Sequence, residues 1–128
     1  MKFKNKQHED FYVKNIQKTN SERDPYRKAL FYTLGLAEQT RTNINDIYDF
    51  AESEIDFACL SKPWQTSTSL RVTRLSFNLY NNFNGIVSDE VIDNPKGYTP
   101  EDIFCNELMP YFFEAIKLRY PEYVRKET

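Results

Sequence analysis

The sequence is poor in glycine, cysteine and histidine. Its 128 residues include three glycines, two cysteines and one histidine. So few glycines argue against a glycine-rich phosphate loop and against tight β-hairpins. Cys59 and Cys105 are far apart and lack CxxC spacing, so we expect free thiols that pack as small apolar side chains rather than a disulfide. With one histidine and two distant cysteines, we expect no metal site.

The chain also lacks a strong net charge and a long apolar run. Seventeen basic and 19 acidic residues give a formal charge of −2. No overall field therefore draws the protein to nucleic acid, and we do not expect direct nucleic-acid binding. No window approaches the ~20 apolar residues of a membrane span, and the polar start MKFKNKQHED lacks the apolar region of a secretory signal. We expect a cytoplasmic protein with no membrane segment.

No catalytic arrangement is visible in the sequence. His8 has no serine or cysteine beside it and falls on the polar side of the first predicted helix, so we expect a solvated side chain. The acidic run over residues 46–56 lacks the D-x-D-x-D-G spacing and the glycine of a calcium loop, which favours a solvated or arginine-pairing face. Without a paired acid and base or an activated nucleophile, we expect a protein that is not an enzyme and needs no cofactor.

What the sequence does contain is a large aromatic complement. Aromatic residues make up 16% of the chain, with ten Phe and nine Tyr, so the core or a binding surface is built from rings. The hydrophobic share of 40% and the charged share of 28% are ordinary for a globular protein. The length predicts one domain over residues 1–128.

Residues that mark the start or the end of a helix occur along most of the chain. Asp24 before Pro25 marks a helix start, and Thr99 before Pro100 marks another. Pro110 interrupts the last helix and restarts it. Two further helices are predicted over residues 6–18 and 67–83. Another is predicted to begin near residue 42 and to carry the apolar residues 44, 47 and 48. One short strand pair is a candidate over residues 85–92. We predict an all-α single domain of five or six helices, with at most a minor β-hairpin, built around the helix at 67–83.

That central helix follows the tryptophan-containing stretch KPWQTSTSLRVTRLSFNLYNN. At about 100° per residue, one arc of the helix is polar: it carries Ser67, Arg71, Arg74, Asn78, Asn81 and Asn82. Apolar residues border this stripe on both sides, with Leu75 and Leu79 on one flank and Leu70 and Phe77 on the other. We therefore expect Phe77 and Leu79 both to be buried.

A polar stripe between two apolar walls is typical of the floor of a cleft. Arginines there need carboxylate or phosphate partners. The start of the helix adds backbone N–H groups and hydroxyls that can receive an anion, and Trp64 could cover a planar group. The pattern predicts a nucleotide-like site. The predicted ligand-binding residues are Trp64, Thr66, Ser67, Arg71, Arg74 and Asn78.

A purely structural role for the same residues stays open. Asp46, Asp49 or Glu52, which lie just before the helix in the sequence, could pair with the two arginines. The Ser/Thr run would then be only a helix cap, and the tryptophan a core residue.

Four segments of the chain resemble segments of a known family: KALFYTLGL, TNINDIYDF, WQTSTSLRVTRLSFNLYNN and PYFFEAIKLRYPEY. Over residues 3–124 it resembles a small uncharacterised family from phages, plasmids and integrative elements of Gram-positive bacteria. The resemblance carries no established activity and no functional residues. It implies an accessory protein of a mobile element, and such proteins often act against host defence.

Two kinds of function follow from these observations. In the first, the protein binds or sequesters an anionic small molecule, such as a signalling nucleotide, in a cleft formed by residues 64–82. In the second, it is an interaction protein that covers a host defence protein or nuclease, with the acidic run 46–56 imitating nucleic-acid phosphates.

Overall fold

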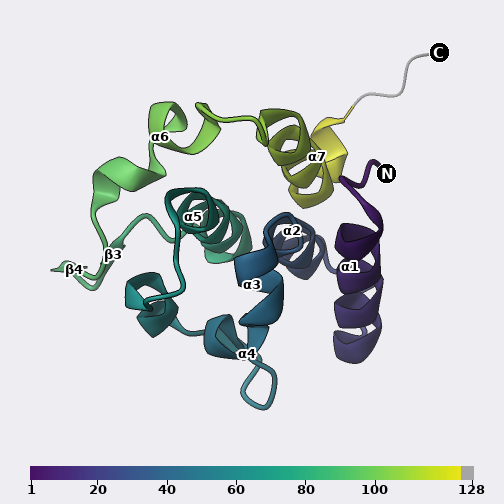
Figure 1. Cartoon of the computed structure of the whole chain (residues 1–128), viewed down its shortest axis with the longest axis horizontal. Helices are drawn as coiled ribbons and strands as arrows, with labels where there is room; N and C mark the ends of the chain where they lie inside the picture. The colour runs from purple at the N-terminus through teal and green to yellow at the C-terminus, as the bar shows by residue number, and fades with distance from the viewer. Residues whose placement is uncertain (125–128) are drawn as a thin grey trace.

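The computed structural model of the protein describes residues 1–124. Within them, short segments connect seven α-helices, three 3₁₀ helices and two small antiparallel strand pairs (Figure 1). The α-helices are α1 (Lys6–Thr19), α2 (Pro25–Leu34), α3 (Glu38–Thr42), α4 (Ile44–Ile47), α5 (Ser67–Asn81), α6 (Pro100–Phe104) and α7 (Met109–Arg119). The strands are β1 (Tyr48–Asp49), β2 (Glu54–Ile55), β3 (Ile86–Val87) and β4 (Glu90–Val91), and the 3₁₀ helices are η1 (Phe57–Ser61), η2 (Pro95–Tyr98) and η3 (Pro121–Tyr123).

Helices α2 and α5 form the middle of the domain. α2 contacts α1, α5 and α7, and its residues 29–34 are buried without a break. α5 contacts α2 together with α3, α6, α7 and η2. Phe77 and Leu79 are both buried, as predicted from the apolar flanks of the polar stripe. The all-α prediction is therefore confirmed, and α2 is enclosed as fully as the helix predicted to lie at the centre.

The helix starts follow the local signals in the sequence. The side chain of Asp24 accepts hydrogen bonds from the N–H groups of Tyr26 and Arg27, and Pro25 occupies the first turn. Thr99 caps α6 in the same way, ahead of Pro100. These caps depend on neighbours within one turn of the chain, which is why the sequence predicts them.

The prediction of a single helix that begins near residue 42 and includes Tyr48 is wrong. The chain makes two short helices, α3 and α4, separated at Asn43, and Tyr48 then adopts extended backbone in β1. β1 pairs with β2 in a strand pair that the sequence did not predict. The tyrosine ring packs edge-on against Phe31 of α2, with 5.4 Å between centroids. Continuing the helix would remove the ring from this contact, so tertiary packing overrides the helical pattern.

His8 is buried, and the prediction of a solvated histidine is wrong. Its Nε2 lies 2.7 Å from the carbonyl oxygen of Tyr32, and its Nδ1 accepts a hydrogen bond of 3.0 Å from the N–H of Lys4. The first residues of the chain cover this side of α1, where the ring of Phe3 contacts the imidazole edge-on. Burial lowers the pKa of His8 to about 4. The imidazole is therefore neutral and uses both ring nitrogens.

None of the helices in residues 1–124 has the length and apolar character needed to cross a membrane. Both cysteines are free thiols. Cys59 is buried as expected, whereas Cys105 is exposed and does not pack as a core residue.

Candidate functional site

The start of α5 is fixed by a reciprocal cap. The hydroxyl of Thr66 accepts a hydrogen bond from the N–H of Ser69 at 3.0 Å, and the Ser69 hydroxyl accepts one from the N–H of Thr66 at 2.7 Å. This capping box satisfies donors at both positions and sets the direction in which the helix leaves the preceding loop. Thr66 is therefore a capping residue, whereas Ser67 and Thr68 in the first turn are exposed.

A small hollow lies between the first turns of α5 and the segment that contains η2 and the start of α6. Its volume is about 200 Å³. It is lined by Ser67, Leu70, Arg71, Arg74, Asn94, Lys96, Gly97 and Asp102. Three of the six predicted ligand-binding residues, Ser67, Arg71 and Arg74, therefore lie at one place.

Arg71 lies on the α5 wall of this hollow. Its Nε–H donates a hydrogen bond of 2.9 Å to the backbone carbonyl of Asp102, which ties α5 to α6. Within residues 1–124, neither Arg71 nor Lys96 on the opposite wall forms an ion pair. The remaining guanidinium N–H groups of Arg71 are therefore not committed to a protein carboxylate. Three cations line the hollow beside the acidic residue Asp102, and of these only Arg74 forms an ion pair within residues 1–124.

Arg74 has a different role. Its Nε and one terminal nitrogen donate to the two carboxylate oxygens of Asp93 at 2.9 and 3.0 Å, and the Tyr98 hydroxyl donates to the same carboxylate at 2.8 Å. The ion-paired side chains are only 17% and 15% exposed. This bidentate pair is the structural role left open above, but its partner is Asp93 rather than Asp46, Asp49 or Glu52.

The pKa shifts of the pair agree with this geometry. The hydrogen bond to Asp93 raises the pKa of Arg74 above its usual value. Burial by itself would raise the pKa of Asp93, but the hydrogen bonds from Arg74 and Tyr98 outweigh it and lower that pKa below its usual value. Both groups are therefore charged at neutral pH, and we call Arg74, Asp93 and Tyr98 the clasp. It fastens the segment before α6 onto α5.

The clasp needs a glycine at position 97. A β-carbon on Gly97 would lie 2.5 Å from the Cζ atom of Arg74, which is closer than such atoms approach in proteins. The guanidinium therefore packs directly over the backbone of η2.

Gly97→Ala should lower the free energy of unfolding by about 1–2 kcal/mol, because the arginine must move away from Asp93 to make room for the methyl group. Chemical denaturation measures this loss. Lys96→Ala at the neighbouring exposed position is the matched control and should change stability by less than about 0.5 kcal/mol. Equal effects of the two substitutions would contradict the close packing of Arg74 on Gly97.

Trp64 and Asn78 lie outside the hollow. The indole N–H of Trp64 donates to the carboxylate of Asp46 at 3.0 Å, and its ring packs against the core. The amide of Asn78 donates to the carbonyl of Phe83 at 3.1 Å and so stabilises the end of α5. Neither side chain is placed to contact a ligand in the hollow. The prediction of a planar group stacked on Trp64 therefore has no geometric support.

Sequence reasoning missed the wall opposite α5. Lys96, Asn94 and Asp102 come from a stretch that reads as an irregular connection and a helix start. The one signal in the sequence was the Pro95-Lys96-Gly97 turn, which combines a cation with the small residue that lets Arg74 approach.

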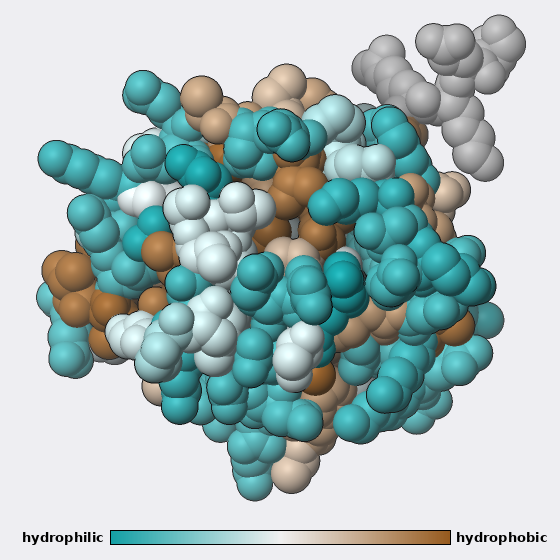
Figure 2. Space-filling view, in the orientation of Figure 1, coloured by the Kyte–Doolittle hydropathy of each residue, from teal (hydrophilic) through white to brown (hydrophobic). Residues whose placement is uncertain are grey.

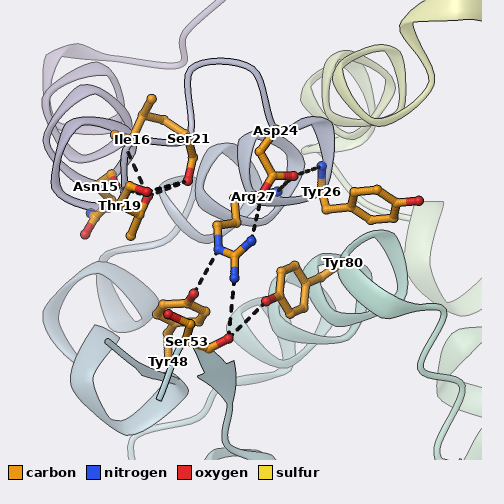
Figure 3. Close-up of polar contacts among 10 residues, drawn as sticks. All are labelled: Asn15, Ile16, Thr19, Ser21, Asp24, Tyr26, Arg27, Tyr48, Ser53 and Tyr80. Atoms are coloured by element: carbon orange, nitrogen blue, oxygen red, sulfur yellow. Dashed lines mark hydrogen bonds and ion pairs between the residues drawn. The ribbon is translucent and has the colours of Figure 1, made fainter. Parts of the chain in front are cut away.

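A second polar cluster surrounds Arg27 in the first turn of α2 (Figure 3). Arg27 donates to the carboxylate of Asp24 at 2.7 Å and to the hydroxyl of Tyr48 at 3.0 Å. Tyr80 of α5 donates to the backbone carbonyl of Ser53, which Arg27 also contacts. Burial would lower the pKa of Arg27, but the hydrogen bonds to Asp24 and Tyr48 raise it. Because its guanidinium already joins α2 to the loop between β1 and β2, this cluster is structural.

No group of three or more His, Cys, Asp or Glu side chains in the part of the chain that the structure describes is arranged to hold a metal ion.

Comparison with known proteins places the chain in a family. A family model described as a family of unknown function, DUF6075, matches residues 1–128, and the chain belongs to that family. A search of curated proteins and a search of solved structures each found no match. The family assignment agrees with the expectation of an uncharacterised family, and says nothing of the mobile elements in which its members occur.

Proposed function

We propose that the protein is a non-catalytic binding protein whose hollow between α5 and η2 takes a phosphate-sized anion. The observation that carries this proposal is the position of Arg71 and Lys96 on facing walls of the hollow, without an ion pair to either within residues 1–124. A guanidinium group binds phosphate oxygens through two parallel hydrogen bonds. Ser67, in the first turn of the 15-residue helix α5, adds a hydroxyl and the positive end of the helix dipole.

The volume of the hollow limits the ligand. At about 200 Å³ it is smaller than the ~300–1,000 Å³ of a typical small-molecule site. It accommodates a phosphate group and the ligand atoms bonded to it, but it does not enclose a whole nucleotide. The rest of a larger ligand would lie on the surface beside Ser67, away from Trp64.

The biological setting is part of the same proposal. We infer an accessory protein of a phage, plasmid or integrative element of a Gram-positive bacterium, acting in the host cytoplasm. Sequestering a phosphorylated signal of host defence is the activity that an anion site without catalytic groups would serve.

The alternative, a protein that imitates nucleic acid through the acidic run 46–56, has less support. Asp46 accepts the indole N–H of Trp64, while Asp49 and Asp56 accept backbone N–H groups two residues further along the chain. The bonds to backbone N–H groups fix local turns, so Asp49 and Asp56 have a structural role of their own.

Calorimetric titration with inorganic pyrophosphate tests the proposal. Arg71→Gln should weaken binding at least about tenfold, since a hydrogen bond to a charged group contributes roughly 1.5–3 kcal/mol. It should leave the unfolding midpoint almost unchanged, because Arg71 has no carboxylate partner to abandon. Arg23→Gln, at an exposed position outside the hollow, is the matched control. Equal affinities of the wild type and both variants, or no heat of binding at all, would contradict the anion site.

A further inference from the structure

The β3–β4 hairpin is the structural feature that the anion site leaves unexplained. Ile86 pairs with Val91 and Val87 with Glu90, and residues 88 and 89 make the turn with left-handed φ angles of 50° and 67°. The hairpin projects at one end of the long axis of the molecule (Figure 1). It is therefore a separate arm on the side away from α1.

Four aliphatic side chains on this arm are exposed. Their exposed fractions are 41% for Ile86, 40% for Val87, 64% for Val91 and 40% for Ile92. Figure 2 shows the corresponding hydrophobic patch at the edge of the molecule where Figure 1 places the hairpin. Exposed aliphatic residues that gather in one place mark interaction sites more often than single exposed ones do.

The exposed residues occupy both faces of the hairpin. Paired residues in an antiparallel ladder point to the same side, so Ile86 and Val91 share one face. Val87 lies on the other face with Glu90, and Ile92 follows β4 at the base of the hairpin. A single flat surface can cover only one of these faces.

The arm is held in place at its base. Ile92 and Asp93 both donate their N–H groups to the carbonyl of Gly85, at 2.7 and 3.1 Å. Gly85 has a φ of +96°, and a β-carbon there would overlap the backbone oxygen of Asp93. The clasp then fixes Asp93 against α5. An arm that is ordered before binding loses less conformational entropy when a partner takes it up.

We propose that the hairpin is a docking arm that enters a cleft of another protein, with apolar walls and a basic residue at the end of the cleft. A cleft with two apolar walls can cover both apolar faces of the hairpin. The adjacent acidic residues Asp89 and Glu90 at its tip would pair with a basic residue at the end of that cleft. A second copy of this chain fits less well, because isologous packing would bring these carboxylates together. A stable dimer also needs roughly 800 Å² from each copy, more than one face with two aliphatic side chains supplies.

The test uses a photoreactive probe in the full chain. Benzoylphenylalanine replaces Val91, and a control protein carries it at Val13, an aliphatic position of α1 with 42% exposure. The proteins are irradiated in the bacterial host of the gene at natural expression levels. We expect the Val91 probe to form an adduct with a single partner, and the cross-linked peptide to contain apolar residues and a lysine or arginine. The Val13 probe should not form this adduct.

A second substitution ties the adduct to the arm. Val87→Asp, on the opposite face, should lower the yield of the Val91 adduct at least about tenfold, whereas Val13→Asp should leave it unchanged. Both positions are exposed, so the thermal midpoint of each variant should match that of the wild type. An adduct between two copies of the chain, equal adducts from both probes, or no adduct from the Val91 probe would each overturn the docking arm. The anion titration is independent of all these results.

Discussion

Replacing Arg74 with glutamine should lower the free energy of unfolding by about 2–4 kcal/mol. Removing one partner of a buried ion pair costs roughly 3–5 kcal/mol, since the other charge is left without compensation. The pair with Asp93 is slightly exposed, which places the expected loss toward the lower end of that range. The loss also includes the attachment of the segment around Tyr98, whose hydroxyl shares the same carboxylate.

Arg71 provides the matched control on the same helix. Arg71→Gln removes a guanidinium that lines the same hollow but has no carboxylate partner within residues 1–124, so it should cost less than about 1 kcal/mol. Urea denaturation of the two variants measures both values. Adding Asp93→Asn to Arg74→Gln should recover part of the loss, because the stranded charge is then gone. If Arg74→Gln and Arg71→Gln cost the same, the clasp does not stabilise the fold.

The free energy of unfolding should fall by about 3 kcal/mol as the pH is lowered from above 6.5 to 4. The pKa of His8 is about 4 in the folded protein and about 6.5 in an unfolded chain. Between these values the unfolded chain binds a proton that the folded protein does not, so stability falls as the pH falls. Each pKa unit corresponds to about 1.4 kcal/mol.

The upper part of this range belongs to His8. Carboxylates of an unfolded chain titrate near pH 4, so a loss between pH 6.5 and pH 5 reports the histidine. Urea denaturation at several pH values measures the slope, and His8→Gln should abolish it over this interval. His8 is the only histidine in the sequence, so its imidazole proton resonance identifies its pKa directly. A midpoint near pH 6.5 in the folded protein would show that the ring is not buried.

The parts of the fold that the sequence predicts depend on local chemistry. Asp24 with Pro25, and Thr99 with Pro100, start helices through bonds to backbone groups within one turn. The two apolar flanks of α5 follow from its period. The extended backbone at Tyr48 does not follow from any local pattern, because it depends on the contact of this ring with Phe31 of α2.

In the candidate site, too, the sequence predicts the residues that one helix brings together but not their partners from other segments. Ser67 and Arg71 lie together because they share one face of one helix. The partner of Arg74, Asp93, lies 19 residues away in a connection without periodicity, so distance along the sequence does not distinguish it from the carboxylates of residues 46–52. The burial of His8 depends on the first residues of the chain folding over α1. Long-range pairing of this kind is settled by the packing of the whole domain rather than by sequence spacing.

The distance between α1 and the hairpin has a practical consequence for surface-based measurements. Figure 1 shows them at opposite ends of the longest axis of the molecule. Lys14 is an exposed amine on α1. A protein coupled to a sensor surface through this amine would present the hairpin toward the flowing solution, whereas coupling through Lys96 would bring both the hairpin and the hollow close to the support. The chemistry of immobilisation thus decides which of the two surfaces a binding experiment can sample.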